Sequence, residues 1–239
     1  KGVKLEAKVL FINCLYQHFQ NFIEVIEGSG VEVEDIMASS LAASLVVLTK
    51  AQKIAGCVLA NIGAETISIA TFENNIPISL EIMPIGSTDI TNDIALGLKI
   101  SLDEAEQIKM GAITSYVYPK KKLEEIIDAR LSDIFELIEA HLKKIGRNEL
   151  LPAGIIITGG GSNISAIEES AKTSLKIPSK IGEISFGGII HPELKNSVYT
   201  VAYGLCIFGF SQENDESLGV KITSITKNNI INWFKQFLP

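Results

Sequence analysis

One short segment restricts the possible folds more than any other. Residues 154–158 read Gly-Ile-Ile-Ile-Thr, and the glycines and serine of 159–162 and a helical pattern over 163–174 follow at once. A strand that is apolar throughout is typical of a sheet covered on both faces. Glycines let a backbone approach a ligand closely, and a helix start offers free N–H groups. The sequence therefore predicts an α/β fold with a ligand site after this strand, with a plain tight turn as the competing interpretation.

The remaining patterns alternate between strands and helices. We expect further strands over 5–13, 31–37, 56–62, 66–72, 76–85 and 179–181. We expect further helices over 14–28, 41–49, 90–98, 102–109, 120–145 and 198–210. The three central strands are joined by short polar turns, which favours an antiparallel meander. Ser101 and Glu104 form the pattern of a capping box at the start of the helix over 102–109.

Composition excludes several classes of protein. The chain has 239 residues, 46% of them hydrophobic, and a net charge of −7, which argues against binding to nucleic acid through phosphate contacts. Cys14, Cys57 and Cys206 are far apart in the sequence and odd in number, so we expect neither a disulfide framework nor a structural zinc site. No apolar run reaches the roughly 20 residues of a membrane-spanning helix. We therefore expect a globular protein of a reducing compartment.

The loop over 159–162 is best interpreted together with a second loop over 61–66. Residues 61–66 read Asn-Ile-Gly-Ala-Glu-Thr at a strand exit, and alone this segment is an ordinary β-turn. Together with the meander and the intervening helices, the two loops resemble the second lobe of the actin-like ATPase superfamily. Within that superfamily the chain resembles the FtsA family of bacterial cell-division proteins. The specific stretches are 86–98 and 151–161, supported by 30–36, 41–44 and 104–109.

The resemblance implies a division of the chain. It implies an actin-like (ribonuclease H-like) α/β lobe that carries an inserted α/β subdomain. The chain would begin inside the subdomain specific to the FtsA family and then enter the first lobe for one helix. The implied parts are the family-specific subdomain (1–38), a connecting helix (39–52), the lobe core (53–86 and 151–210), its inserted subdomain (87–150), a flexible linker (211–226) and an amphipathic helix (227–239).

The resemblance also implies a site for ATP with Mg²⁺ between two lobes. The hairpin would face the phosphates with Gly63, Ala64, Glu65 and Thr66. Glu106 and Lys109, which lie one helical turn apart, would hold the ribose and base. The loop over 159–162 would pass close to the adenosine with Gly159, Gly160, Gly161 and Ser162.

The hairpin departs from the family pattern. Asn61 stands where the family has an Asp, and Ala64 and Glu65 replace two glycines. The first change removes a carboxylate that could hold Mg²⁺ through water, and Glu65 adds charge and bulk near phosphate oxygens. The first lobe's own hairpin lies outside these residues, and a cleft with one wall does not exclude water. We therefore expect weak nucleotide binding and no efficient ATP hydrolysis by this chain.

The C-terminal residues have an amphipathic helical pattern. Apolar residues occupy one arc of a helical wheel, and Asn228 and Asn232 lie on the other side. Such a helix suits the surface of a bilayer, with lysines meeting anionic lipid. A helix docked on the protein's own core is the alternative, and the acidic segment 211–217 favours a tether instead. The expected membrane-contacting residues are Lys227, Ile230, Ile231, Trp233, Phe234, Lys235, Phe237 and Leu238.

Partners follow from the resemblance alone. It implies an adaptor that self-associates, holds FtsZ polymers to the cytoplasmic face of the membrane at the division septum and receives the FtsZ C-terminal tail near Arg130. An actin-like ATPase or a pilus-assembly adaptor of the same superfamily is the alternative. We expect His18, His141 and His191 to be structural, and Asp89 and Asp93 to serve the start of the helix over 90–98.

Overall fold

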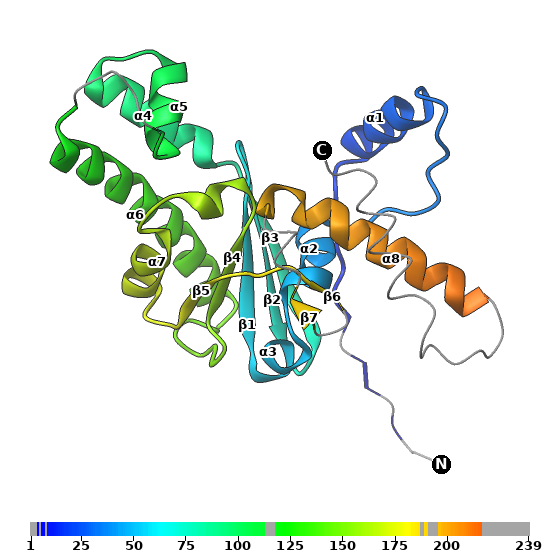
Figure 1. Cartoon of the computed structure of the whole chain (residues 1–239). Helices are drawn as coiled ribbons and strands as arrows, with labels where there is room; N and C mark the ends of the chain where they lie inside the picture. The colour runs from blue at the N-terminus through cyan, green and yellow to red at the C-terminus, as the bar shows by residue number, and fades with distance from the viewer. Residues whose placement is uncertain are drawn as a thin grey trace.

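A five-stranded sheet forms the centre of the molecule (Figure 1). The computed structural model describes residues 4, 6, 7, 9–112, 118–186, 189, 190 and 196–216. The sheet has the order β3-β2-β1-β4-β5. The first three strands form the predicted antiparallel meander, and β4 and β5 continue from β1 in parallel. The strands are β1 (Cys57–Ile62), β2 (Ile67–Glu73), β3 (Ile76–Met83), β4 (Ile155–Thr158) and β5 (Ser179–Ile181).

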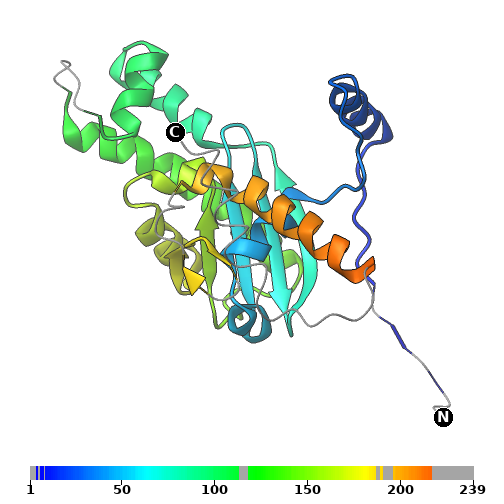
Figure 2. The same cartoon turned by 45° about the vertical axis from the view of Figure 1, so that its right-hand side comes forward.

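Helices cover both faces of this sheet. One face packs against α6 (Lys120–Lys144) and α7 (Ile167–Leu175). The other packs against α2 (Ser39–Val47), and α8 (Thr200–Glu216) crosses over α2 (Figures 1 and 2). The short helix α3 (Lys50–Ala55) joins α2 to β1, and β6 (Ser185–Phe186) and β7 (Ile189–Ile190) form a small hairpin that the sequence did not predict.

Strand β4 is buried on both faces, which explains its unbroken apolar sequence. Ile155 and Ile157 belong to the core cluster under α6 and α7. Ile156 points the other way and belongs to the cluster under α2 and α8. All three are at most 1% exposed. The two-sided coverage inferred from the sequence is confirmed.

An arm rises beyond the carboxyl ends of β1 and β4. It consists of α4 (Ser87–Leu98), α5 (Leu102–Lys109) and the first part of α6 (Figure 1). Ser101 Oγ lies 3.3 Å from the Glu104 backbone N–H that it accepts from, and the Glu104 carboxylate accepts from the Ser101 N–H at 3.2 Å. This confirms the predicted capping box and the boundaries of α5.

The expected strands at the beginning of the chain are not formed. Among the residues described before α2, only α1 (Tyr16–Glu27) is regular, and it stands apart from the sheet (Figure 2). Val9 and Phe11 are 66% and 79% exposed. A strand requires a neighbour to satisfy its backbone groups, and within the described residues neither 5–13 nor 31–37 pairs with one.

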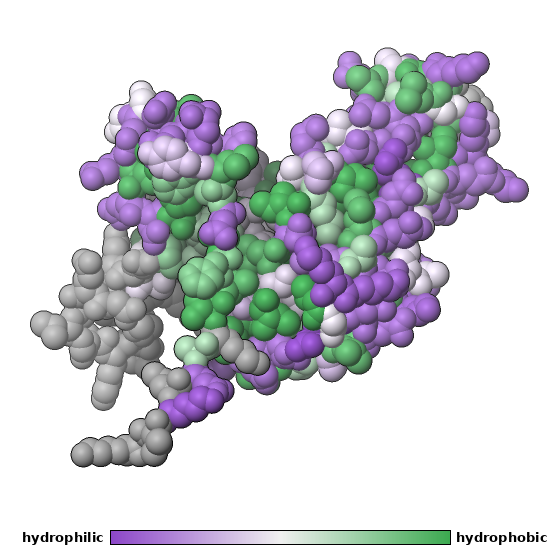
Figure 3. Space-filling view, turned by 180° about the vertical axis from the view of Figure 1, so that it is seen from behind, coloured by the Kyte–Doolittle hydropathy of each residue, from purple (hydrophilic) through white to green (hydrophobic). Residues whose placement is uncertain are grey.

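Seen from behind, the body of the molecule carries a group of hydrophobic side chains between helix α1 and the arm of α4 and α5 (Figure 3).

The first residues of the predicted linker belong to a helix. Helix α8 continues through residues 211–216, so the first six residues assigned to the linker are helical. This stretch contains neither Gly nor Pro to stop a helix. The Ser211 hydroxyl also donates to the Phe208 carbonyl at 2.7 Å inside the helix. In the part of the chain that the structure describes, no helix has the length and apolar character to cross a bilayer, and the amphipathic segment 227–239 lies outside that part.

His141 is structural, as predicted. Its Nε2 lies 2.7 Å from the Ser79 hydroxyl of β3, and its Nδ1 lies 3.3 Å from a carboxylate oxygen of Glu81. The residue is 7% exposed and joins α6 to β3. Burial lowers the pKa of its imidazole, although the Glu81 charge opposes this shift. His18 is exposed on α1, and His191 lies outside the described residues.

Candidate functional site

The two glycine-bearing loops meet at one edge of the sheet. Parallel pairing of β1 with β4 sets Asn61 opposite Thr158, so both loops begin at the same level. Gly159 has φ +87° and ψ 174°, a conformation open almost only to glycine. A Cβ there would lie 2.5 Å from both Asn61 Oδ1 and the Ile62 carbonyl oxygen. Gly159 therefore permits the loop over 159–162 to pack directly on the end of β1.

The first turn of α4 supports the hairpin from its other side. The Ser87 N–H donates to the Gly63 carbonyl, and the Thr88 N–H donates to the Ala64 carbonyl, both at 2.9 Å. The Asp89 carboxylate accepts from the Gly86 N–H at 2.8 Å, which confirms its expected role at this helix start. Ala64, Glu65 and Thr66 remain exposed at the tip. The hairpin is thus held at its base and open at its tip.

The loop after β4 forms a short 3₁₀ turn, η1 (Gly160–Asn163), ahead of α7. The Ser162 hydroxyl is buried, lies 2.7 Å from the Gly159 carbonyl and 3.0 Å from Ser197 Oγ. Ser197 also donates to the Gly159 carbonyl, at 2.8 Å. Ser162 therefore shapes the loop with its hydroxyl. Sequence analysis missed Ser197 because no local pattern links it to a loop more than thirty residues earlier.

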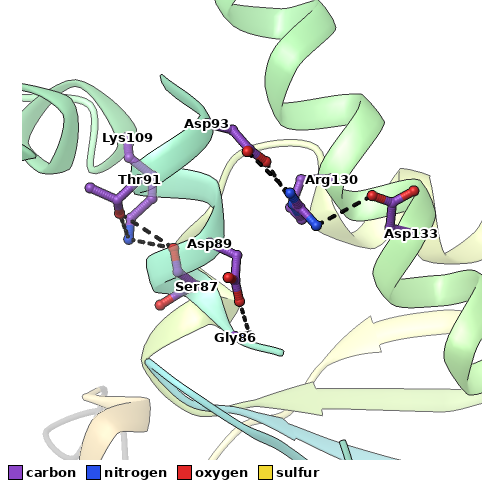
Figure 4. A network of polar contacts seen from close by, with 8 residues as sticks. All are labelled: Gly86, Ser87, Asp89, Thr91, Asp93, Lys109, Arg130 and Asp133. Carbon is purple, nitrogen blue, oxygen red and sulfur yellow. Dashed lines mark hydrogen bonds and ion pairs between the residues drawn. The ribbon is translucent and has the colours of Figure 1, made fainter. Parts of the chain in front are cut away.

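Glu106 and Lys109 lie together at the end of α5, beside the first turn of α4. Lys109 Nζ lies 2.7 Å from a Glu106 carboxylate oxygen and 2.8 Å from the Thr91 hydroxyl. Figure 4 shows Lys109 directed at Thr91 and Ser87. Burial would raise the pKa of the Glu106 carboxyl, but hydrogen bonds from Lys109 and Thr91 outweigh it and the pKa lies below its ordinary value. Half of the Glu106 side chain is exposed, whereas that of Lys109 is 3% exposed.

A cavity of about 250 Å³ opens between the arm and η1. Its walls include Lys109 and Tyr118 from the arm side and Asn163 and Ser165 from the loop side. Apolar groups with a few polar atoms at such a place fit an aromatic base and its sugar. A second, more open cavity of about 540 Å³ lies along residues 162–169.

The hairpin expected to face the phosphates fits a magnesium triphosphate poorly. Asn61, the penultimate residue of β1, carries a neutral carboxamide whose Nδ2 lies 3.5 Å from the Ser68 hydroxyl. Glu65 is exposed at the hairpin tip, where a phosphate would meet its negative charge. No group of three metal-ligating side chains occurs among the residues that the structure describes. Because Asn61 is neutral and Glu65 is negative, the hairpin suits a nucleoside better than a magnesium triphosphate.

Arg130 lies on α6, away from the glycine loops. Its Nε and one terminal nitrogen donate to the two Asp93 carboxylate oxygens at 2.6 and 3.1 Å, and Asp133 lies 3.4 Å away (Figure 4). The Asp93 bond raises the pKa of the guanidinium. Asp93 thus ties α4 to α6, which corrects the expectation that it serves the start of α4.

The mixed sheet, its two helical layers and the glycine loops at one edge define an actin-like fold. A structure titled MreB5 of Spiroplasma citri bound to ADP matches with a TM-score of 0.67 at 17% identity, over 86% of this chain and 69% of that one. A structure titled PilM-PilN type IV pilus biogenesis complex matches with a TM-score of 0.64 at 18% identity, over 80% and 57%. At these identities the likeness shows the fold alone.

Sequence comparison identifies the family. The family model described as Cell division protein FtsA matches residues 58–204, and the chain therefore belongs to this family. The chain is 31% identical over 236 residues to Cell division protein FtsA of Pseudomonas aeruginosa, covering 90% of this chain and 56% of that relative. It spans about half the length of the curated relatives that it matches.

Proposed function

We propose that this chain is the nucleotide-responsive and membrane-binding part of a cell-division adaptor, which holds FtsZ polymers at the cytoplasmic face of the membrane and helps assemble the septum. The observation that supports this most strongly is the FtsA family match over 58–204. The amphipathic sequence of 227–239 supports the membrane role. Self-association would strengthen membrane binding because linked weak anchors act with avidity.

The membrane role is tested by co-sedimentation with vesicles that contain anionic lipid, using the chain with and without residues 227–239. A sharper pair is Phe234→Asp and Asn232→Asp, which add the same charge on opposite sides of the expected helix. We expect the first to abolish pelleting and the second to weaken it slightly, because only Phe234 would enter the acyl region. Equal pelleting of the full and shortened chains would refute membrane anchoring by this segment.

For the nucleotide role, we propose that a nucleoside lies in the cavity lined by Lys109, Tyr118, Asn163 and Ser165, with Gly159–Gly161 beside it. The phosphates would point to the tip of the hairpin at Gly63–Thr66. The supporting observation is the juxtaposition of both glycine loops with this cavity. Titration with fluorescent ADP and ATP, in the presence of Mg²⁺, tests it.

A double substitution tests whether Asn61 and Glu65 weaken the binding of ATP with Mg²⁺. Asn61→Asp with Glu65→Gly restores a carboxylate near the metal position and removes charge from the hairpin tip. We expect this variant to bind ATP with Mg²⁺ more tightly than the present chain does, while adenosine binding stays unchanged. Tight binding and rapid hydrolysis of ATP by the unaltered chain would contradict our interpretation of the hairpin and favour an ATPase role.

The partner role concerns Arg130. We propose that a carboxylate of the FtsZ tail competes with Asp93 for this guanidinium. Binding of the tail peptide should weaken in Arg130→Ala and strengthen in Asp93→Asn, because the latter releases the guanidinium from its bidentate partner. Arg147→Ala is the matched control, since Arg147 binds Glu73 at 2.8 Å elsewhere on the body. Unchanged peptide affinity in Arg130→Ala would limit Arg130 to tying α4 to α6.

A further inference from the structure

The ammonium group of Lys109 has all three of its donors engaged within the protein. Its partners are the Glu106 carboxylate at 2.7 Å, the Thr91 hydroxyl at 2.8 Å and the Ser87 carbonyl at 3.1 Å. An ammonium carries three N–H groups, and the side chain is 3% exposed. A direct bond from Lys109 to the ribose or base would require one of these buried contacts to break. The lysine is therefore placed to hold the protein rather than the nucleotide.

Its backbone partner leads directly to the hairpin. The carbonyl of Ser87 accepts from Lys109, and the N–H of the same peptide group, that of Thr88, donates to the Ala64 carbonyl at 2.9 Å. A peptide group polarised by a cation at its oxygen becomes a stronger donor at its nitrogen. One peptide group therefore connects the lysine of α5 to the hairpin between β1 and β2.

Thr91 and Glu106 hold the lysine in this position. The Thr91 hydroxyl donates to the Glu106 carboxylate at 2.5 Å and accepts from Lys109. The three side chains come from two consecutive helices, so they also fix α5 against the start of α4. Figure 4 shows two of them, Thr91 and Lys109. Asp89, whose carboxylate accepts from the Gly86 N–H, closes the same turn from the other side.

We propose that Lys109 is a positioning residue of the phosphate hairpin: through Ser87 and Thr88 it holds the carbonyls of Gly63 and Ala64, so that the hairpin is set before nucleotide binds. The nucleotide part of this inference rests on the proposed function, whereas the support of the hairpin does not.

The first test needs no nucleotide. Amide hydrogen exchange of the full 239-residue chain is compared with that of Lys109→Met, which keeps the length of the side chain and removes the ammonium. We expect the Ser87 and Thr88 amides to exchange roughly tenfold faster, as loss of one supported hydrogen bond predicts, while those of β4 and α7 are unchanged. Thr91→Val, which keeps shape and removes one partner, should show the same local pattern more weakly and serves if Lys109→Met does not fold.

Lys122→Met is the matched control. Lys122 donates to the Gly97 carbonyl at 2.5 Å, at the other end of α4. We expect it to leave the Ser87 and Thr88 amides as they are. Unchanged exchange at both amides in Lys109→Met, or equal acceleration throughout the chain, would overturn the proposal.

The second test compares ADP with adenosine. A residue that positions the phosphate hairpin affects ligands that carry phosphates, whereas a residue that binds the nucleoside affects both. Because Lys109 also lines the proposed nucleoside cavity, we expect Lys109→Met to weaken ADP binding several-fold and adenosine binding much less. Equal weakening of both would make Lys109 a direct ligand and refute its positioning role. If the unaltered chain binds neither ligand, the nucleotide proposal fails, while the exchange measurement still decides whether Lys109 supports the hairpin.

Discussion

Replacement of Gly159 by alanine should be among the most damaging single-methyl changes in this chain. The backbone conformation of φ +87° and ψ 174° costs a non-glycine residue about 1–3 kcal/mol. The added Cβ would also lie 2.5 Å from Asn61 Oδ1 and the Ile62 carbonyl, and such overpacking typically costs about 1–3 kcal/mol. Both partners belong to β1 at the centre of the sheet, so they have little freedom to move. The expected loss in the free energy of unfolding is about 2–6 kcal/mol.

Urea denaturation followed by far-ultraviolet circular dichroism measures this loss. Gly160→Ala is the neighbouring control, since Gly160 has no positive φ and its Cβ would meet Val198 at an ordinary 3.5 Å. Gly209→Ala is a control of opposite sign, because an alanine in open space on α8 should stabilise the helix by about 0.5–1 kcal/mol. If Gly159→Ala lost no more stability than Gly160→Ala, the argument for close packing of the two loops would be wrong.

Three further outcomes are expected. Burial lowers the pKa of His141 in the folded chain, so the unfolded state binds more protons. The free energy of unfolding should therefore fall as pH drops below 6.5. Urea titrations at pH 7.5 and 5.5 measure this fall, and His141→Gln should make it smaller. Phe135→Ala should lower the free energy of unfolding by about 3–5 kcal/mol, because Phe135 is fully buried. Leu137→Ala, two residues along α6, should lower it by less than about 1 kcal/mol, because Leu137 is 44% exposed. Similar losses in the two variants would contradict the packing of this helix. Burial raises the pKa of the Cys57 thiol to about 11, so a thiol reagent should modify exposed Cys14 quickly and Cys57 only on unfolding. A fast phase that survives in Cys14→Ser with Cys206→Ser would contradict this, because Cys57 is then the one remaining thiol.

The sequence contained enough local information for the sheet and most helices. The apolar run at 155–157, the meander turns and the capping box at Ser101 each depend on neighbours within a few residues, and all of them are confirmed. The pairing of the two glycine loops was also accessible, because strands followed by glycine share an edge in a parallel arrangement. Family resemblance supplied what periodicity did not, namely the actin-like class.

The remaining features depend on contacts between distant residues. Sequence patterns did not reveal that Lys109 would be buried against α4. Its partners there, Thr91 and Ser87, precede it by 18 and 22 residues. No sequence pattern indicated that Arg130 pairs with Asp93, because these residues lie on two different helices. The strands expected over 5–13 and 31–37 failed for a related reason: alternation of apolar residues specifies a face, but a strand also requires a partner.

The parallel pairing of Val58 with Ile155 has a consequence for how the chain is made. The meander of β1, β2 and β3 is local and can close while synthesis proceeds, but the other edge of β1 must wait for β4. Bacterial and eukaryotic synthesis runs at roughly 5–20 residues per second, so that edge stays open for on the order of 5–20 s. During that interval the backbone groups of β1 that later pair with β4 have no partner strand. A newly made chain therefore exposes an unpaired edge of β1 until the α4–α6 arm and β4 have been synthesised.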